Sequence, residues 1–305
     1  MQIAIAISNA TRRFGAIVAV DRLSLDVEKG EIFAIVGPDG AGKTTLMRLI
    51  CGALALDEGT ISVDGVDLTR ETALVQASIG YMPQRFSLYP DLSVMENLRF
   101  YGDIFGVARA KFAEHAKELL EEFSLAPFGE RLADELSGGM KQKLALACTL
   151  IHKPATILLD EPTAGVDPVS RREFWRILYR INGTGTTILV STPYMDEAER
   201  AHRVAFVTRG AVLTCGSPAE LKSHLAGEVV EVSGARRADM RRVLHGEPSV
   251  RSVEIFGDAL HALVPSAATA IPAMRARLEN AGIQGASLKT IAPSLEDAFV
   301  ARLQP

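Results

Sequence analysis

A glycine-rich segment near the N-terminus, from Gly37 to Thr45, constrains the fold of this chain more than any other feature. It reads Gly-Pro-Asp-Gly-Ala-Gly-Lys-Thr-Thr and matches the phosphate-binding loop pattern G-x-x-x-x-G-K-[ST]. The apolar run 31–36 before it predicts a buried strand, and residues 46–50 after it predict the start of a helix. An ordinary glycine turn would explain the glycines, but not Gly-Lys-Thr at this offset. The segment therefore predicts a nucleotide site.

The chemistry of this loop is the binding of a phosphate chain. Glycines let successive backbone N–H groups surround phosphate oxygens at a helix N-terminus, whose partial positive charge favours an anion. We expect Lys43 to reach the β- and γ-phosphates and the Thr44 hydroxyl to ligate Mg²⁺. The expected nucleotide contacts are the whole loop: Gly37, Pro38, Asp39, Gly40, Ala41, Gly42, Lys43, Thr44 and Thr45.

A second apolar run, residues 155–159, ends in the two carboxylates Asp160 and Glu161. Its composition is typical of a buried parallel strand, and open α/β sheets bind ligands beyond the carboxyl ends of their strands. Adjacent side chains on a strand point to different sides, so the two acids need not share a role. Asp160 suits a Mg²⁺ ligand acting through water, whereas Glu161 suits a base that polarises an attacking water. Two solvated acids at a strand end are the simpler alternative for either residue alone.

Two other residues each have two interpretations. Phe14 can stack on an adenine ring, since base stacking tolerates any aromatic face, or it can be a half-buried aromatic at a strand end. Gln84 follows a short expected strand that ends at Pro83. Its amide can contact Mg²⁺ or a water near the γ-phosphate, or it can be an ordinary surface glutamine.

The order of the expected elements predicts the architecture. Strand and helix patterns that alternate around a phosphate loop indicate an α/β P-loop fold with a mainly parallel sheet. We expect an antiparallel edge subdomain and a helical insertion over about residues 86–150, in which Ser137 caps the last helix. The expected elements are strands at 3–8, 19–27, 31–36, 79–82, 155–159, 186–192, 204–207 and 212–213, a hairpin at 59–66 and a helix at 170–181.

The C-terminal part has a pattern of its own. Strands are expected at 229–232, 250–255, 260–264 and 288–291, with helices at 236–244 and 271–281. This β-α-β-β-α-β order predicts a small ferredoxin-like α+β domain. We therefore expect two domains, 1–225 and 226–305.

Composition excludes several functional classes. The chain has 305 residues and a net charge of −4, which argues against a dedicated nucleic-acid binder. Its three cysteines are far apart, so neither a zinc site nor a disulfide framework is indicated, and a reducing compartment fits. No apolar run approaches the roughly 18 residues that span a bilayer, so any membrane span must come from another polypeptide.

Together these motifs resemble the nucleotide-binding domain of ABC transporters, over about residues 1–225. The segment 136–140 matches the family signature LSGG and ends in Met. The resemblance implies that ATP is the nucleotide and Mg²⁺ its metal, with Thr44, Gln84 and Asp160 at the metal. It also implies roles for the following residues: Phe14 stacks on adenine, Gln84 lies in the Q-loop, Glu161 is catalytic, and Asp167 belongs to the D-loop.

The resemblance further implies a mechanism shared between two ATPase domains. Ser137, Gly138 and Gly139 of one chain would present a hydroxyl and backbone N–H groups to the γ-phosphate held by the other chain. Closure on ATP would drive a change in membrane permease subunits, which the segment 85–89 would contact. The chain would then be cytoplasmic, bound to the inner face of the cell membrane through the permease.

One residue departs from the family pattern. The switch histidine that senses the γ-phosphate would occupy position 193, where this chain has proline. Because proline has no side-chain donor, the site built on this chain's own phosphate loop should hydrolyse ATP slowly. We expect the chain to pair with a different, competent ATPase. A homodimer that relies on Glu161 alone is the alternative.

The subfamily is indicated by several short stretches. Residues 37–40, 80–84, 92–98 and 140–144 resemble the ATP subunits of ABC-2-type exporters, and most of all the first half of YbhF-type multidrug export ATPases. This implies export of a drug or another small molecule. Two other classes stay open: a non-transport ABC ATPase acting on ribosomes or DNA, and a regulatory module that closes on ATP without turnover.

Overall fold

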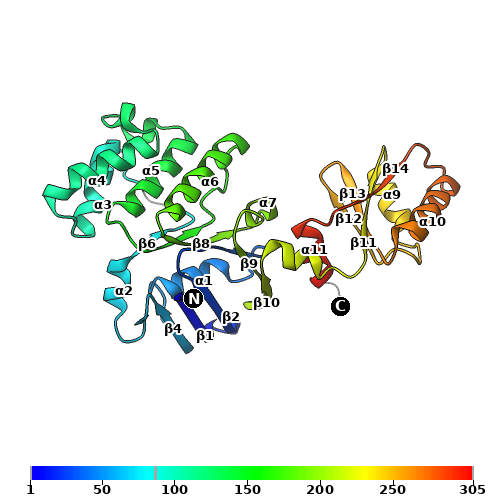
Figure 1. The fold of residues 1–305 in the computed structure, drawn as a ribbon, viewed down its shortest axis with the longest axis horizontal. Coiled ribbons are helices and arrows are strands. Elements are labelled where there is room, and N and C mark those ends of the chain that lie inside the picture. The colour runs from blue at the N-terminus through cyan, green and yellow to red at the C-terminus, as the bar shows by residue number, and fades with distance from the viewer. Residues whose placement is uncertain (1, 86–87, 304–305) are drawn as a thin grey trace. The chain divides into compact units, whose positions relative to one another are not determined.

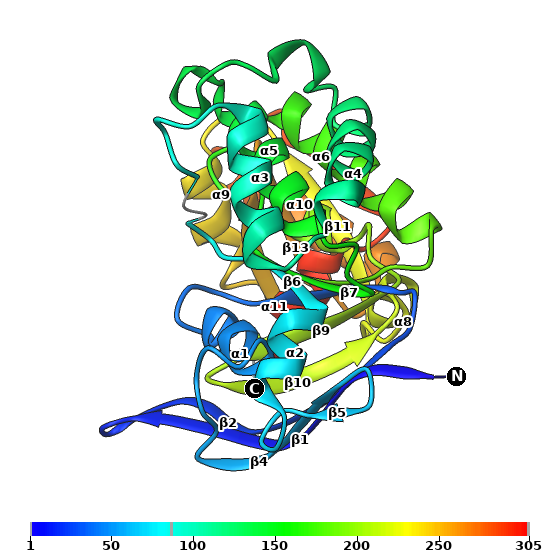
Figure 2. The same cartoon turned by 90° about the vertical axis from the view of Figure 1, so that its left-hand side faces the viewer.

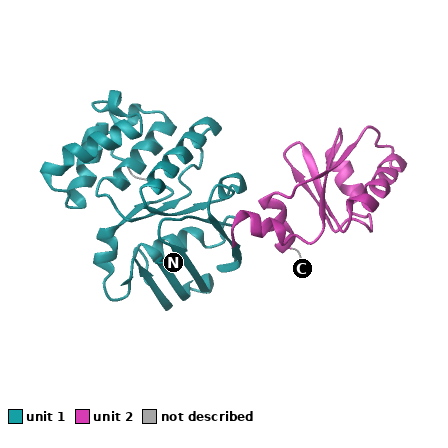
Figure 3. Cartoon of the chain, viewed as in Figure 1, with its two compact units in different colours: residues 1–215 teal, residues 216–305 magenta. Residues whose placement is uncertain are grey.

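The computed structural model describes residues 2–85 and 88–303. The chain divides into two compact units, residues 1–215 and 216–305 (Figures 1 and 3). This division lies before the domain boundary expected at residue 225. The helix α8 (Pro218–Ser223), which contacts α11 (Leu295–Leu303), accounts for the difference because it is part of the second unit.

A six-stranded sheet forms the centre of the first unit, in the order β10-β9-β3-β8-β7-β6. Strand β3 pairs in parallel with β8 and β9, and β7 pairs in parallel with β6 and β8. Every residue of β3, β7 and β8 is buried, which explains their continuous apolar sequences. The expected mainly parallel sheet is confirmed. Its strands are β3 (Ile32–Val36), β6 (Ile79–Met82), β7 (Thr156–Asp160), β8 (Thr187–Thr192), β9 (Arg203–Thr208) and β10 (Ala211–Gly216).

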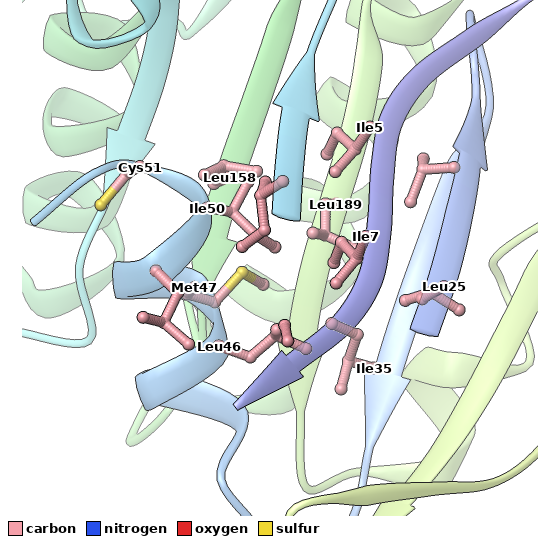
Figure 4. Close-up of a cluster of buried hydrophobic side chains, with 14 of the residues drawn as sticks. Ile5, Ile7, Leu25, Ile35, Leu46, Met47, Ile50, Cys51, Leu158 and Leu189 are labelled. Carbon is pink, nitrogen blue, oxygen red and sulfur yellow. The ribbon is translucent and has the colours of Figure 1, made fainter. Parts of the chain in front are cut away.

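An antiparallel sheet, in the order β2-β1-β4-β5, forms the expected edge subdomain. Its strands are β1 (Ile3–Phe14), β2 (Ile17–Glu28), β4 (Glu58–Val63) and β5 (Val66–Asp67). The turn between the last two contains Asp64 and Gly65, both at positive φ. Side chains from β1, α1 (Lys43–Ile50) and the central strands gather in one apolar core, so the antiparallel sheet and the phosphate-loop helix share their interior with the central sheet (Figure 4).

The helical part of the first unit consists of α3 (Val94–Ile104), α4 (Arg109–Glu122) and α5 (Gly138–Leu150), which contact one another (Figure 2). Ser93 begins α3 with a capping box, in which its hydroxyl accepts the N–H of Glu96. The remaining helices are α2 (Thr72–Ser78), α6 (Pro168–Gly183) and α7 (Met195–Ala198), with short 3₁₀ turns at Ala126–Phe128 and Ala133–Glu135. Within the described ranges, no helix has the length and apolar character needed to cross a bilayer.

The second unit contains the expected β-α-β-β-α-β succession. It comprises β11 (Glu228–Ser233), α9 (Arg237–Leu244), β12 (Ser252–Phe256), β13 (Ala259–Val264), α10 (Ala267–Asn280) and β14 (Ser287–Ile291). The sheet order is β12-β13-β11-β14, and all the pairs are antiparallel. Buried residues of the strands and of both helices form a separate core, so the sheet has its own hydrophobic layer.

Candidate nucleotide-binding site

A cavity of about 600 Å³ lies where the phosphate loop meets the carboxyl ends of the parallel strands. Ligands of open α/β sheets bind in this position because loops that follow neighbouring parallel strands converge there. The cavity is lined by residues of five separate segments: Ile17, Val18 and Ala19; Asp39 to Thr45; Gln84; Glu161 and Ala164, which follow β7; and Pro193 and Tyr194, which follow β8.

The phosphate loop is held in a shape that requires glycine at two positions. Gly42 has a φ of 101°, and a Cβ there would lie 2.3 Å from the Ala19 carbonyl oxygen. A Cβ on Gly37 would lie 2.1 Å from the carbonyl oxygen of Val207 on β9. The loop therefore packs against neighbouring backbone, which leaves its cavity side for a ligand.

Lys43 is the buried cation of the loop, with only 4% of its side chain exposed. Its Nζ donates to the carbonyl oxygens of Gly37 at 2.9 Å and Pro38 at 3.2 Å, and lies 3.4 Å from Oε1 of Glu161. The ammonium group is thus already directed across the mouth of the loop. It can exchange these contacts for phosphate oxygens.

Asp160, at the end of β7, is fully buried. Its Oδ1 accepts hydrogen bonds from Thr44 Oγ1 at 3.2 Å and from Ser191 Oγ at 2.6 Å. Its Oδ2 finds no hydrogen-bond partner within residues 2–85 and 88–303. A buried carboxylate oxygen left without a partner, next to a threonine hydroxyl, fits a hard cation such as Mg²⁺, which prefers oxygen ligands.

Glu161 is held by both its backbone and its side chain. Its φ of 48° is unusual for a residue with a side chain. The backbone N–H donates to the carbonyl oxygen and to Oγ of Ser191, at 3.1 and 3.0 Å. Oε2 accepts from Gln84 Nε2 at 2.9 Å, so the amide expected near the metal contacts the glutamate. The contacts with Gln84 and Lys43 hold the Glu161 carboxylate beside the phosphate loop.

The signature residues lie apart from this cavity, at the N-terminus of α5. Ser137 Oγ caps the helix by accepting the N–H of Met140 at 3.3 Å. A Cβ on Gly138 would meet open space, whereas one on Gly139 would lie 2.8 Å from Ser170 Oγ on α6. This helix end is therefore exposed at Gly138 and is not part of the cavity formed by the chain's own phosphate loop.

The expected site residues Phe14 and Asp167 also lie outside the cavity lining, as do Gly37, Pro38 and Asp160. Phe14 ends β1 with 45% of its surface exposed, and the Arg12 guanidinium lies 5.0 Å from its ring centre. Asp167 caps α6 by accepting the N–H groups of Val169 and Ser170, each at 3.0 Å. The hydrogen bonds from Ser170 hold the pKa of Asp167 below its usual value, so its carboxylate stays charged. Their roles toward ATP stay predictions.

Residues of β8 and the segment after it were missed by sequence reasoning. Ser191 lies opposite Asp160 in the parallel pairing of β7 with β8, and its hydroxyl contacts both acidic residues. Tyr194 lines the cavity next to Pro193. The only signal for them was that a buried strand ends in two hydroxyl residues, Ser191 and Thr192, which is uncommon in an otherwise apolar run.

Comparison with known proteins places these features in a family. The ABC transporter family profile matches residues 20–164. The multidrug ABC transporter ATP-binding protein YbhF of Escherichia coli is 41% identical over 285 residues, covering 92% of this chain and 48% of that protein. The daunorubicin resistance ATP-binding protein DrrA2 of Streptomyces coeruleorubidus is 34% identical, covering 95% of this chain and 91% of that protein. The Nod factor export ATP-binding protein I of Paraburkholderia xenovorans is 36% identical, with coverages of 97% and 96%.

Solved structures are similar over about seven tenths of the chain. The ATP-binding subunit of an ABC transporter superposes with a TM-score of 0.66 at 26% identity, covering 72% of this chain and 92% of the other. A dimeric ATP-binding cassette in a post-hydrolysis state with ADP and Pi superposes with a TM-score of 0.63 at 27% identity, covering 70% and 98%. The chain spans about half the length of YbhF, but nearly the whole length of DrrA2.

Proposed function

Because this chain belongs to the family of ABC transporter ATP-binding proteins, we propose that it hydrolyses ATP to energise an ABC-2-type exporter of drugs or other small molecules. The observation that carries the proposal is the convergence of Lys43, Thr44 and Glu161 at one cavity, with Asp160 hydrogen-bonded to Thr44. The relatives' names, which refer to multidrug transport, daunorubicin resistance and Nod factor export, support the export of small molecules.

The residues divide the chemistry between them. The loop N–H groups and Lys43 would bind the phosphate chain of ATP, and Thr44 and Asp160 would hold Mg²⁺. The bound metal would neutralise charge on the phosphate oxygens. Glu161 would accept a hydrogen bond from the attacking water and polarise it, while the Gln84 amide keeps the glutamate carboxylate directed at the cavity.

A complete site needs a second ATPase domain. Ser137, Gly138 and Gly139 lie at an exposed helix N-terminus away from the chain's own phosphate loop, which suits contact with a γ-phosphate held by a partner. The dimeric form of the similar post-hydrolysis cassette supports this arrangement. Each site would then combine the phosphate loop of one domain with the signature of the other.

Pro193 favours pairing with a different ATPase rather than with a second copy of this chain. It lines the cavity beside Tyr194, where the family carries a histidine, and it supplies no side-chain donor. The site on this chain's phosphate loop would therefore turn over slowly. The signature of this chain would complete a faster site on another ATPase, which gives a heterodimer.

A second hollow, of about 430 Å³, is the proposed contact with the permease. It lies between the Gln84 segment and the signature helix, and Arg85, Leu88 and Lys141 help to line it. Of the segment 85–89, Phe86 and Ser87 lie outside the described residues. A partner held here would contact both the catalytic glutamine and the helix that reaches the second ATP. The chain would thus act at the inner face of the membrane.

Replacement of Pro193 by histidine tests the proposal. The ATPase rate of the full chain is measured for wild type, Pro193→His and Glu161→Gln, each alone and mixed with neighbouring ATPase and permease subunits. We expect slow wild-type turnover that either a partner or the histidine raises by about tenfold or more, because a donor to a developing negative charge is worth ~10²-fold or more in rate. Glu161→Gln should reduce turnover to a small residual rate.

Other results would point elsewhere. If wild type alone has a full rate that only Glu161→Gln removes, the proline is tolerated and a homodimer is the better description. If ATP binds but no assembly turns it over, the chain is a regulatory module and the proposed ATPase function is wrong.

A further inference from the structure

Glu197, on α7, is a charged residue that the proposed reaction does not use. It is 0% exposed, although it lies only three residues beyond Tyr194 at the wall of the cavity. A carboxylate is placed in a protein interior only at a cost unless hydrogen bonds and a counter-charge satisfy it. Its partners therefore indicate what the residue holds together.

Three side chains from three different segments satisfy this carboxylate. Oε1 accepts a hydrogen bond from Thr163 Oγ1 at 2.5 Å and lies 3.3 Å from Nε of Arg171 on α6. Oε2 accepts from Thr192 Oγ1 at 2.7 Å. Thr163 and Thr192 are themselves 1% exposed. Thr163, Arg171, Thr192 and Glu197 are called the Glu197 cluster below.

Each of the two threonines lies next to a segment that lines the cavity. Thr163 is in the turn that follows Glu161, and the next residue, Ala164, lines the cavity and donates its N–H to the Glu161 carbonyl at 3.1 Å. Thr192 ends β8, and its Oγ1 accepts the N–H of Tyr194 at 3.1 Å. One carboxylate thus connects the turn of the catalytic glutamate with the loop at the switch position.

Arg171 holds the same loop from a second side. Its guanidinium lies 4.0 Å from the ring centre of Tyr194, in a cation–π contact, while its Nε lies 3.3 Å from Oε1 of Glu197 as an ion pair. Tyr194 is therefore held through its backbone by Thr192 and through its ring by Arg171. This bracing matters at position 193, where proline offers no side-chain anchor of its own.

The Glu161 turn needs such support. A residue with a side chain at a φ of 48° is strained, and strained backbone persists only where the surrounding contacts determine it. Ser191 fixes the N–H of Glu161, and the hydrogen bond from Thr163 to Glu197 fixes the turn that follows. Stability alone is a weak reason for the charge, since apolar residues of similar volume often replace buried ion pairs without loss.

We infer that Glu197 is a positioning residue for the hydrolytic step. It holds the Glu161 turn and the 193–194 loop in one arrangement, so that the carboxylate of Glu161 meets the water at a fixed distance from the phosphate. The inference rests on the proposed ATPase function. Within the described part of the chain, the hydrogen bonds and the ion pair of Glu197 reach Thr163, Thr192 and Arg171 and no residue of the phosphate loop. Glu197 therefore sets the rate of turnover and not the affinity for ATP.

The substitution Glu197→Gln tests the inference in the full chain, in wild type and, if wild-type turnover is slow, in Pro193→His. Glutamine has the same shape, but its NH₂ group cannot accept a threonine hydroxyl and its neutral amide no longer pairs with Arg171. We expect kcat to fall about tenfold and KM for ATP to change less than about twofold, because small displacements of a catalytic group mainly affect rate.

Glu31→Gln is the matched control. Glu31 is also a buried carboxylate paired with an arginine, since its Oε1 lies 3.1 Å from Arg203 Nη1, and it does not line the cavity. The variant Glu31→Gln should leave kcat unchanged. Thr163→Val and Thr192→Val should lower kcat as Glu197→Gln does, whereas Thr163→Ser and Thr192→Ser, which retain the hydroxyl, should restore it.

A second comparison separates positioning from folding. In the Glu161→Gln background, Glu197→Gln should lower the residual rate no further, because Glu197 acts through the group already removed. The inference is overturned if Glu197→Gln lowers only the melting temperature, or if Glu31→Gln lowers kcat equally. It is also overturned if the losses of rate caused by Glu161→Gln and Glu197→Gln multiply in the double variant. A wild-type chain without Glu161-dependent turnover in any assembly would instead refute the proposed function.

Discussion

At the scale of single residues, one hydroxyl on β8 organises both carboxylates at the end of β7. Ser191 is fully buried; its Oγ donates to Asp160 Oδ1 at 2.6 Å and accepts the Glu161 N–H at 3.0 Å. A serine hydroxyl can donate and accept at once, whereas no apolar residue of similar size can do either. Ser191 therefore determines the orientation of the Asp160 carboxylate and of the Glu161 backbone together.

We expect Ser191→Ala to reduce kcat by about tenfold, roughly 1.4 kcal/mol in the barrier, because Asp160 and Glu161 each lose a hydrogen bond that orients them. Turnover and melting temperature are measured together. Thr187→Val is the control, since it removes a hydroxyl that accepts the Gly30 N–H at the other end of the same strand. Equal losses of rate in both variants would show that strand stability, and not orientation, is responsible.

Sequence reasoning identified the site residues that are close together along the chain. The phosphate loop is one continuous segment, and Asp160 and Glu161 follow a recognisable buried strand, so local pattern was sufficient for them. Ser191 and Glu197 act through pairings that depend on which strands are neighbours, and no local pattern specifies those pairings. Residue types alone therefore indicated the residues of the proposed reaction, but not the side chains that hold those residues in place.

At the scale of helices and strands, the sequence pattern predicted the interior of each element well. It did not predict the residues at which the elements begin and end. The helix expected from Ser170 begins at Pro168, because Asp167 caps it and proline suits the first helical turn. Strand β1 extends to Phe14 rather than ending at residue 8, since it pairs with β2 on one side and β4 on the other. Pairing of this kind extends a strand beyond the segment in which its apolar residues alternate.

His152, just after α5, connects the helical part of the first unit with the central sheet. Its Nε2–H donates to the Ile79 carbonyl at 3.1 Å, and its ring stacks on Phe105 with the centres 3.9 Å apart. Burial lowers the pKa of His152, and the hydrogen bond to Ile79 only partly opposes this effect. The folded protein therefore holds a neutral imidazole at this junction.

The lowered pKa of His152 makes the free energy of unfolding depend on pH. Its ordinary pKa is 6.5 and its folded pKa is lower, so below about pH 6.5 the unfolded chain binds a proton that the folded chain does not. The stability that goes with the neutral imidazole is fully present above about pH 6.5, and it is lost as pH falls toward the pKa of the folded protein. We expect melting temperature to drop less between about pH 7.5 and 5.5 in His152→Gln than in wild type. Parallel slopes in the two proteins would contradict this.

At the scale of the whole molecule, each of the two units contains a hydrophobic core of its own. One joins β1, α1 and the central strands, and the other lies on the sheet β12-β13-β11-β14 under α9 and α10. The order of helices and strands was sufficient to predict the second fold, since a β-α-β-β-α-β succession has few compact solutions. The division between the units was less accessible, because α8 carries the sequence pattern of a short surface helix that either unit could include.

Because each unit has a hydrophobic core of its own, we expect the two units to unfold in separate thermal transitions. Leu260, on β13, is fully buried in the second core, so Leu260→Ala should destabilise residues 216–305 by about 2–5 kcal/mol. Saturating Mg-ATP should stabilise only residues 1–215, by about 2.7 kcal/mol at a hundredfold excess over Kd. Scanning calorimetry of the full chain should therefore show one transition that moves with the mutation and another that moves with the ligand, while ATP affinity in Leu260→Ala stays at the wild-type value. A single transition that shifts with both changes would mean that the two units unfold as one cooperative body, and that the C-terminal unit contributes to the stability of the nucleotide site.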